Sequence, residues 1–118
     1  MQRKFRLTRS EDFKRVRRSG RSYAHPLVVL IVQAHDQPRA HTRVGITAGR
    51  TVGTAVRRNR AKRLLREAMR SLLPETASNV NILLIARPAL ASAALEEARA
   101  ALQNLLQRAN LFVPLHES

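Results

Sequence analysis

A basic segment with an apolar stripe, residues 54–72, constrains the fold more than any other part of the chain. Its apolar residues recur at helical spacing, which predicts an amphipathic helix with one face on a core. The members of this stripe are Ala61, Leu64, Leu65, Ala68 and Leu72. Pro74 predicts that the helix ends at about Leu73. The rest of the chain must therefore supply a layer that covers the stripe.

The other side of this helix is strongly cationic and carries Glu67 as its opposing carboxylate. Cations recur there at every fourth position, as Arg58, Lys62, Arg66 and Arg70, with Arg63 beside them. Like charges at this spacing destabilise a helix by about 0.2–0.5 kcal/mol a pair. Arg57 and Arg58 also fall in the first turn, where the helix dipole disfavours cations. We interpret this side as a surface for a polyanion, because arginine can hold a phosphate through two hydrogen bonds.

The whole chain shares this charge imbalance. It has 118 residues, with 22 Lys and Arg against 8 Asp and Glu, a formal charge of +14 and a pI near 12.0. Such a balance is typical of nucleic-acid-binding domains. The length fits one domain over residues 1–118, in which we expect residues 1–8 to be a flexible basic arm and 111–118 a short tail.

Composition also limits the compartment and the kinds of site. The chain has no cysteine, which excludes disulfides and thiolate metal sites. No apolar run reaches the roughly 18–20 residues of a membrane span, and the basic N-terminal segment lacks the apolar region of a signal peptide. We therefore expect a cytoplasmic protein with no membrane partner.

The remaining patterns predict a sheet and two more helices. Thr8 and Glu11 have capping-box spacing before a short helix that Gly20 ends. Strands are expected at residues 22–25, 27–32, 42–47 and 79–87, and a last helix from Pro88 to about Asn110. The second and fourth strands are almost wholly apolar, as strands covered on both faces are. A hairpin connection would make the third strand antiparallel to the second.

This order of elements, α-β-β-β-α-β-α, defines the expected fold class. It predicts a single α+β domain, with three helices on a four-stranded sheet in a two-layer sandwich. Candidate catalytic residues are not apparent. The acids are scattered without an inward-facing pair for metal ions. The histidines, which lie at strand ends or in the tail, are most simply solvated; they are His25, His35, His41 and His116.

Three segments around the basic helix have a familiar arrangement. They are Arg43-Val44-Gly45, Gly53-Thr54-Ala55-Val56, and residues 58–67 with the sequence RNRAKRLLRE. Together they resemble the signature, often called the RNR motif, of the protein subunit of bacterial ribonuclease P. The rest of the chain fits that family in order and length. The resemblance implies that the strands before and after the basic helix pair in parallel.

The resemblance also implies a function. In that ribonucleoprotein endoribonuclease the RNA subunit cuts the 5′ leader from precursor tRNA, using Mg²⁺, and the protein subunit is non-catalytic. The expected partners are therefore ribonuclease P RNA and precursor tRNA, with no DNA. No catalytic residue, metal ligand or bound cofactor is expected in the protein itself.

The expected sites fall on two surfaces. The resemblance maps contacts with the catalytic RNA to Arg50, Arg58, Asn59, Arg60, Lys62, Arg63 and Arg66, and the charge pattern adds Arg57 and Arg70. It maps a leader-binding cleft, between the first helix and the sheet, to Phe13, Arg17 and Ile31. Relatives commonly have an aromatic residue at the position of Arg17, and some have one at Ile31. From the residues alone, Phe13 is either a core anchor or a stacking platform.

Three other functions share some of these features. A ribosomal or other RNA-assembly protein could use the same basic helix on folded RNA. A free-standing nuclease would need catalytic residues that the sequence does not show. A DNA-binding protein could place a basic helix in the major groove, but no dimerising heptad or helix-turn-helix spacing supports this class.

Overall fold

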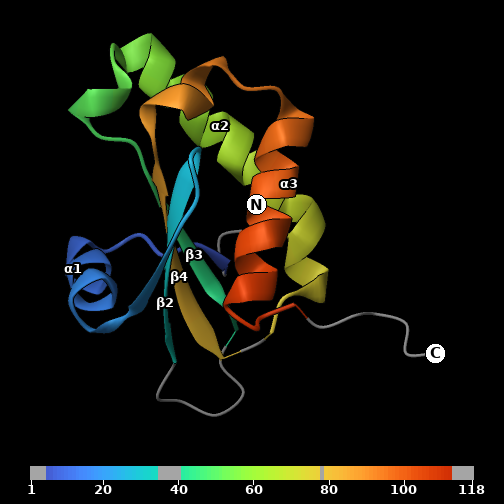
Figure 1. Cartoon of the computed structure of the whole chain (residues 1–118). Helices are drawn as coiled ribbons and strands as arrows, with labels where there is room; N and C mark the ends of the chain where they lie inside the picture. The colour runs from blue at the N-terminus through green and yellow to red at the C-terminus, as the bar shows by residue number, and fades with distance from the viewer. Residues whose placement is uncertain (1–4, 35–40, 78, 113–118) are drawn as a thin grey trace.

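The chain folds as a mixed sheet with α-helices on both faces (Figure 1). The computed structural model describes residues 5–34, 41–77 and 79–112. The elements in order are α1 (Ser10–Ser19), β1 (Arg21–Ala24), β2 (Val28–Ala34), β3 (Arg43–Thr47), η2 (Arg50–Val52), α2 (Ala55–Leu72), η3 (Leu73–Glu75), β4 (Val80–Ala86), η4 (Pro88–Ser92) and α3 (Leu95–Arg108), where η marks a short 3₁₀ helix. The α+β class and the order of helices and strands are confirmed.

The strand order in the sheet is β1-β2-β4-β3. Strand β2 pairs antiparallel with both β1 and β4, and β3 pairs parallel with β4. The connection between β2 and β3 is therefore not a hairpin, whereas the parallel pairing of β3 with β4, the strands that flank the basic helix, is confirmed. Strand β4 lies between β2 and β3. It is almost wholly apolar, as a central strand is, and Ile82, Leu83 and Leu84 are fully buried there.

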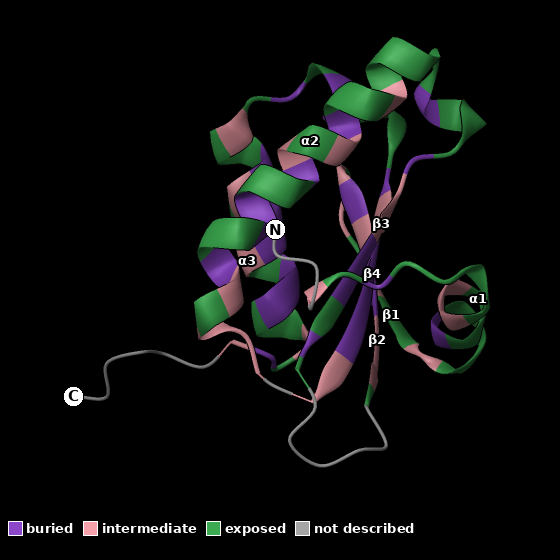
Figure 2. Cartoon of the chain, turned by 180° about the vertical axis from the view of Figure 1, so that it is seen from behind, coloured by how far each residue is buried: buried purple, intermediate pink, exposed green. Residues whose placement is uncertain are grey.

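Strands β2 and β4 bury side chains on both faces of the sheet. Leu30, Ile82 and Leu84 belong to the main core with α2 and α3. Their neighbours Ile31 and Leu83 face the other way, into a smaller cluster under α1. The molecule therefore has a further layer beyond the expected two, with α1 alone on one face (Figures 1 and 2). The prediction that these two strands are covered on both faces is confirmed.

Helix α2 packs as its apolar stripe predicts. Its buried residues are Ala61, Leu65, Ala68, Met69 and Leu72. Leu64 is only partly buried. The helix begins after Thr54, whose Oγ1 accepts a hydrogen bond from the Arg57 N–H at 3.3 Å. It ends at Leu72, and Pro74 lies in the η3 turn that follows.

Two helix boundaries differ from the sequence prediction. Helix α1 begins after Arg9, without a side-chain cap, so the expected Thr8–Glu11 capping box does not form. Helix α3 begins at Leu95, because η4 and two extended residues, Ala93 and Ala94, precede it. The Ala94 N–H donates to Glu97 Oε1 at 2.9 Å and caps the helix there. The buried Leu90 and Ala93 hold this connection on the core.

The described parts of the arm and tail pack against the domain. Leu7 is buried, and its N–H donates to the Val44 carbonyl of β3 at 2.9 Å. Leu111 is also buried, and its carbonyl accepts from the Ala77 N–H at 2.7 Å. Residues 1–4 and 113–118, the outer parts of the expected arm and tail, lie outside the described residues. No helix among the described residues is long and apolar enough to cross a membrane.

Candidate nucleic-acid interface

The cations of α2 lie away from its buried stripe. Arg63, Arg66 and Arg70 are exposed, and Arg58 and Lys62 are half-buried. Within the part of the chain that the structure describes, several basic side chains form no hydrogen bond or ion pair: Arg50, Arg58, Lys62, Arg63 and Arg66. The Nε of Arg58 is shielded from solvent without an acceptor. This surface therefore carries uncompensated positive charge that a polyanion can neutralise.

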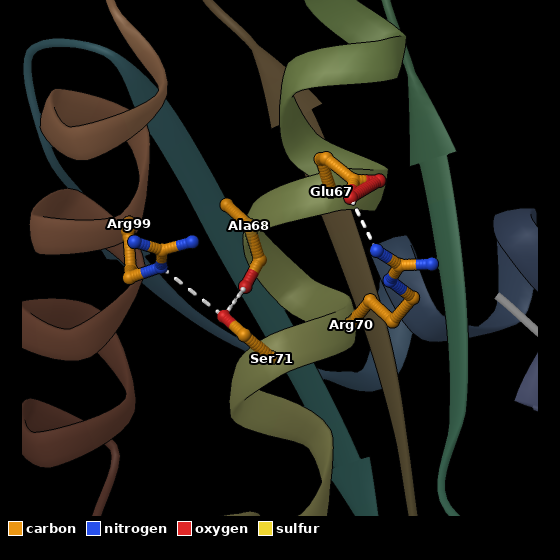
Figure 3. Close-up of polar contacts among 5 residues, drawn as sticks. All are labelled: Glu67, Ala68, Arg70, Ser71 and Arg99. Carbon is orange, nitrogen blue, oxygen red and sulfur yellow. Dashed lines mark hydrogen bonds and ion pairs between the residues drawn. The ribbon is translucent and has the colours of Figure 1, made fainter.

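The carboxylate of α2 compensates little of that charge. Glu67 Oε1 pairs with Arg70 Nη2, one helical turn along, and both side chains are at least half exposed (Figure 3). Exposed pairs of this kind contribute about 0–1 kcal/mol. On the adjoining side of α2, Arg99 of α3 donates to Ser71 Oγ at 3.2 Å, and Ser71 in turn donates to the Ala68 carbonyl at 2.9 Å. Arg99 thus joins the two helices instead of extending the basic surface.

The short helix η2, which precedes α2, carries a further cation, Arg50. Arg50 is exposed on η2, and the buried Val52 anchors that turn to the core. Gly53 follows with a φ of 128°, a conformation that favours glycine. A Cβ at Gly53 would also lie 2.9 Å from Cδ of Arg57, so the glycine leaves room for that side chain.

Arg57 and Arg60 differ from the other cations of α2, because they bind other parts of the protein. Arg57 Nε donates to the Val52 carbonyl at 3.2 Å, and its Nη2 lies 3.5 Å from Ser92 Oγ. Arg60 donates through Nε to the Ala91 carbonyl at 2.8 Å and through Nη2 to the Ala93 carbonyl at 3.0 Å. The sequence pattern predicted the same role for all of these cations. The acceptors that distinguish them come from η2, through Val52, and from the connection after β4, through Ala91, Ser92 and Ala93.

Asn59 is exposed between these arginines. Further along α2, a shallow hollow of about 240 Å³ lies between this helix and the start of α3. Its lining includes two cations, one acid and an apolar pair: Arg60, Arg63, Glu67, Leu64 and Leu95. All nine predicted RNA-contacting residues therefore lie on η2 and α2, and two of them, Arg60 and Arg63, line the hollow.

The second predicted surface lies between α1 and the sheet. Phe13 is half-buried and Arg17, one turn further along α1, is exposed. The ring of Phe13 lies on the backbone of β3, since a Cβ at Gly45 would be 2.8 Å from its Cε1. Ile31 is only 6% exposed and belongs to the cluster under α1. The surface predicted to bind the leader therefore has a half-buried aromatic ring beside a buried apolar side chain.

Two residues of this surface escaped the sequence prediction. Val29 and Ile85 are partly buried and pack against the same cluster as Phe13. They are direct partners across β2 and β4, and each lies two residues from a member of the cluster, Ile31 or Leu83. The alternation of strand faces could have identified Val29 from Ile31. Ile85 required the register between the strands.

The acids and histidines take no part in a common site within the described residues. No group of three or more His, Asp or Glu side chains that could hold a metal ion occurs in residues 5–34, 41–77 and 79–112. His25 Nδ1 accepts a hydrogen bond from the Leu27 N–H at 3.1 Å. The exposed His41 meets the Phe5 ring edge-on at 5.4 Å. His35 and His116 lie outside the described residues.

Comparison of the sequence with known proteins gives a consistent result. The family Ribonuclease P matches residues 1–110. The ribonuclease P protein component of Herpetosiphon aurantiacus is 41% identical over 112 residues, covering 95% of this chain and 89% of the relative. That of Symbiobacterium thermophilum is also 41% identical, over 111 residues, covering 94% of this chain and 96% of the relative.

Solved structures show the same fold. The Staphylococcus aureus RNase P protein superposes with a TM-score of 0.80 at 27% identity, covering 92% of this chain and 97% of that one. The Thermotoga maritima RNase P protein gives a TM-score of 0.76 at 29% identity, covering 87% and 96%. With the basic helix, the sheet topology and the family match in agreement, this chain belongs to the ribonuclease P protein family.

Proposed function

We propose that this protein component of ribonuclease P binds the catalytic RNA through α2 and η2 and thereby promotes removal of the 5′ leader from precursor tRNA. The observation that carries the proposal is the row of cations on α2 that have no acid partner among the described residues, Arg58, Lys62, Arg63 and Arg66. Folding these charges onto one helix is unfavourable, and RNA phosphates relieve the repulsion.

The leader of precursor tRNA is the second ligand in this proposal. It would lie on the surface formed by α1 and the adjoining face of the sheet, where Phe13 offers a partly exposed ring and Arg17 an exposed charge. Val29 and Ile85 provide aliphatic surface beside them. A single aromatic side chain gives few stacking contacts, so we expect charge and aliphatic packing to contribute much of the leader affinity.

The chemistry of cleavage would belong to the RNA. In this proposal the RNA subunit binds the Mg²⁺ ions that activate water and stabilise the leaving oxygen, and the protein contributes binding and orientation. The protein acts in the cytoplasm, where precursor tRNA is made in bacteria.

The test is a comparison of matched arginine variants in binding to ribonuclease P RNA. Arg58→Gln and Arg63→Gln each remove one charge that has no partner among the described residues. Arg108→Gln is the control, because it removes the same charge from α3, where Arg108 donates to the Ala24 carbonyl at 2.6 Å. We expect each α2 variant to weaken binding by roughly tenfold at moderate salt, with the control nearly unchanged.

The salt dependence gives an independent check of the same surface. About six neutralised phosphates predict a slope of roughly −4 to −5 in a plot of log affinity against log salt. Removal of one contact should make the slope shallower by about 0.7–0.9. Equal losses in Arg63→Gln and Arg108→Gln would show that RNA responds only to net charge, and the assignment of the surface to α2 would then fail.

A further inference from the structure

The guanidinium of Arg60, the second arginine of the RNR motif, is held by the protein backbone. Its Nε and Nη2 donate to the carbonyls of Ala91 and Ala93 at 2.8 and 3.0 Å. These two donors form the Nε–Nη2 edge of the guanidinium, one of the two edges through which an arginine can hold a phosphate by two parallel hydrogen bonds. That edge of the exposed Arg60 is thus already bound to backbone carbonyls of this protein.

The N-terminal part of α2 has little else to fix it. The first buried residue of the helix is Ala61, so residues 55–60 place no side chain in the core. Within the described chain, Arg57 and Arg60 are the side chains of this part that form hydrogen bonds with another segment. Their partners are Val52, Ser92, Ala91 and Ala93. Arg58 and Asn59 lie between these two anchors.

The connection that receives Arg60 is itself well anchored. Helix η4 follows directly from the end of β4, and Leu90, Ala91 and Ala93 are all buried. The carbonyls of Ala91 and Ala93 lie where η4 ends and the backbone becomes extended before α3. Arg60 therefore joins the start of α2, which places no side chain in the core, to a buried part of the fold. It also donates hydrogen bonds to two backbone carbonyls there.

We propose that Arg60 is a positioning residue: it clamps the start of α2 onto the η4 connection, so that Arg58 and Asn59 are presented to RNA in a fixed orientation, and it makes no phosphate contact of its own. The inference rests on the proposed function, since RNA is the ligand so positioned. It divides the RNR motif into contacting and positioning members. Arg57 has a similar role, because it bonds to Val52 of η2 and to Ser92 of η4.

The test replaces Arg60 by citrulline in the full-length chain, with the same replacement of Arg63 as the matched control. Citrulline keeps Nε–H and one NH₂ side by side, so it can still donate to Ala91 and Ala93, but it carries no charge. Affinity for ribonuclease P RNA is then measured against salt concentration. Arg60→Ala, which removes charge and donors together, is the third variant.

The positioning role predicts a distinct pattern. Citrulline at 60 should leave affinity within about threefold and the salt slope unchanged, whereas citrulline at 63 should make the slope shallower by roughly 0.7–0.9. Arg60→Ala should weaken binding by roughly tenfold. Equal changes in slope for citrulline at 60 and at 63 would overturn the proposal, and this comparison stands even if Arg60→Ala fails to fold.

A measurement on the free protein separates this inference from the proposed function. In nuclear magnetic resonance spectra, the Nε–H of Arg60 should exchange with water more slowly than that of Arg63, because only the former is hydrogen-bonded. Equal exchange rates would refute the clamp. Failure of the unaltered chain to bind the RNA would instead refute the proposed function, while the exchange comparison would still decide whether Arg60 is held.

Discussion

Gly45→Ala tests how the Phe13 ring is placed on the sheet. Gly45 lies in β3, and the missing Cβ leaves the space that the ring occupies. An added Cβ would be 2.8 Å from Cε1 and 2.9 Å from Cζ of Phe13, and 3.3 Å from Cβ of Leu7. Ordinary carbon contacts begin at about 3.5 Å, so the ring must withdraw by roughly 0.6–0.7 Å.

Two opposing effects set the size of the change in stability. Overpacking of this kind costs about 1–3 kcal/mol, and the lower end applies because the ring is half-exposed and can move outward. Replacing glycine by alanine also restricts the unfolded chain, which stabilises the fold by about 0.4–1 kcal/mol. We expect a net loss of about 0.5 kcal/mol and a fall in Tm of about 2–3 °C.

The effect on leader binding should exceed that on stability. Stacking of one base on an aromatic side chain contributes about 1–3 kcal/mol, and displacement of the Phe13 ring should remove much of it. The assay compares affinity of the assembled enzyme for precursor tRNA with affinity for mature tRNA. We expect Gly45→Ala to reduce the advantage of the precursor by roughly fivefold.

Gly49→Ala is the matched control. Gly49 has an extended backbone, with φ of −81° and ψ of −178°, and a Cβ there would meet nothing within 4 Å. This variant should be neutral or stabilised by up to about 1 kcal/mol, with leader binding unchanged. If Gly45→Ala matched Gly49→Ala in both Tm and leader dependence, the contact between Phe13 and Gly45 would have no part in shaping the cleft.

Three further outcomes follow from the packing and charge of the described residues. Gly20→Ala should lower the free energy of unfolding by at least about 2 kcal/mol in urea titration, because its Cβ would clash with the Val16 carbonyl oxygen, and backbone cannot move aside as a ring can. A neutral result would contradict the close packing at the end of α1. Leu65→Ala should cost about 2–5 kcal/mol, since Leu65 is fully buried, and a loss below 1 kcal/mol would show that the apolar stripe of α2 is misplaced. Glu67→Gln should change the free energy of unfolding by less than about 1 kcal/mol. It should strengthen RNA binding, because it releases Arg70 from its ion pair. Unchanged or weaker RNA binding would place Arg70 outside the RNA surface.

Much of this fold follows from periodicity in the sequence. The stripe from Ala61 to Leu72 predicts the buried face of α2, and the apolar runs predict strands covered on both faces. The pairing of β3 was harder to predict from the local sequence, because strands adjacent in sequence often form hairpins. Here β4 lies between β2 and β3, so these two strands do not pair. The resemblance to a known family supplied that information where the local pattern could not.

The candidate site divides in the same way. A row of arginines at helical spacing predicts a basic face, but it does not reveal which guanidinium meets a carbonyl from elsewhere in the chain. Arg60 is held by Ala91 and Ala93, more than 30 positions away. The sequence predicted an unbroken helix after Pro88, in which these carbonyls would bond within the helix. In the structure, η4 and the extended residues after it leave the carbonyls free to accept from Arg60.

The most direct test of the proposed function is cleavage of a 5′-extended precursor tRNA at near-physiological magnesium. A bacterial ribonuclease P RNA is assayed with and without this protein, alongside the protein alone. We expect strong stimulation of the RNA, cleavage at the mature 5′ end, and no cleavage by the protein alone. Tight RNA binding without stimulation would contradict the proposed role and favour an RNA-assembly function, and cleavage by the protein alone would place the catalytic residues in this chain.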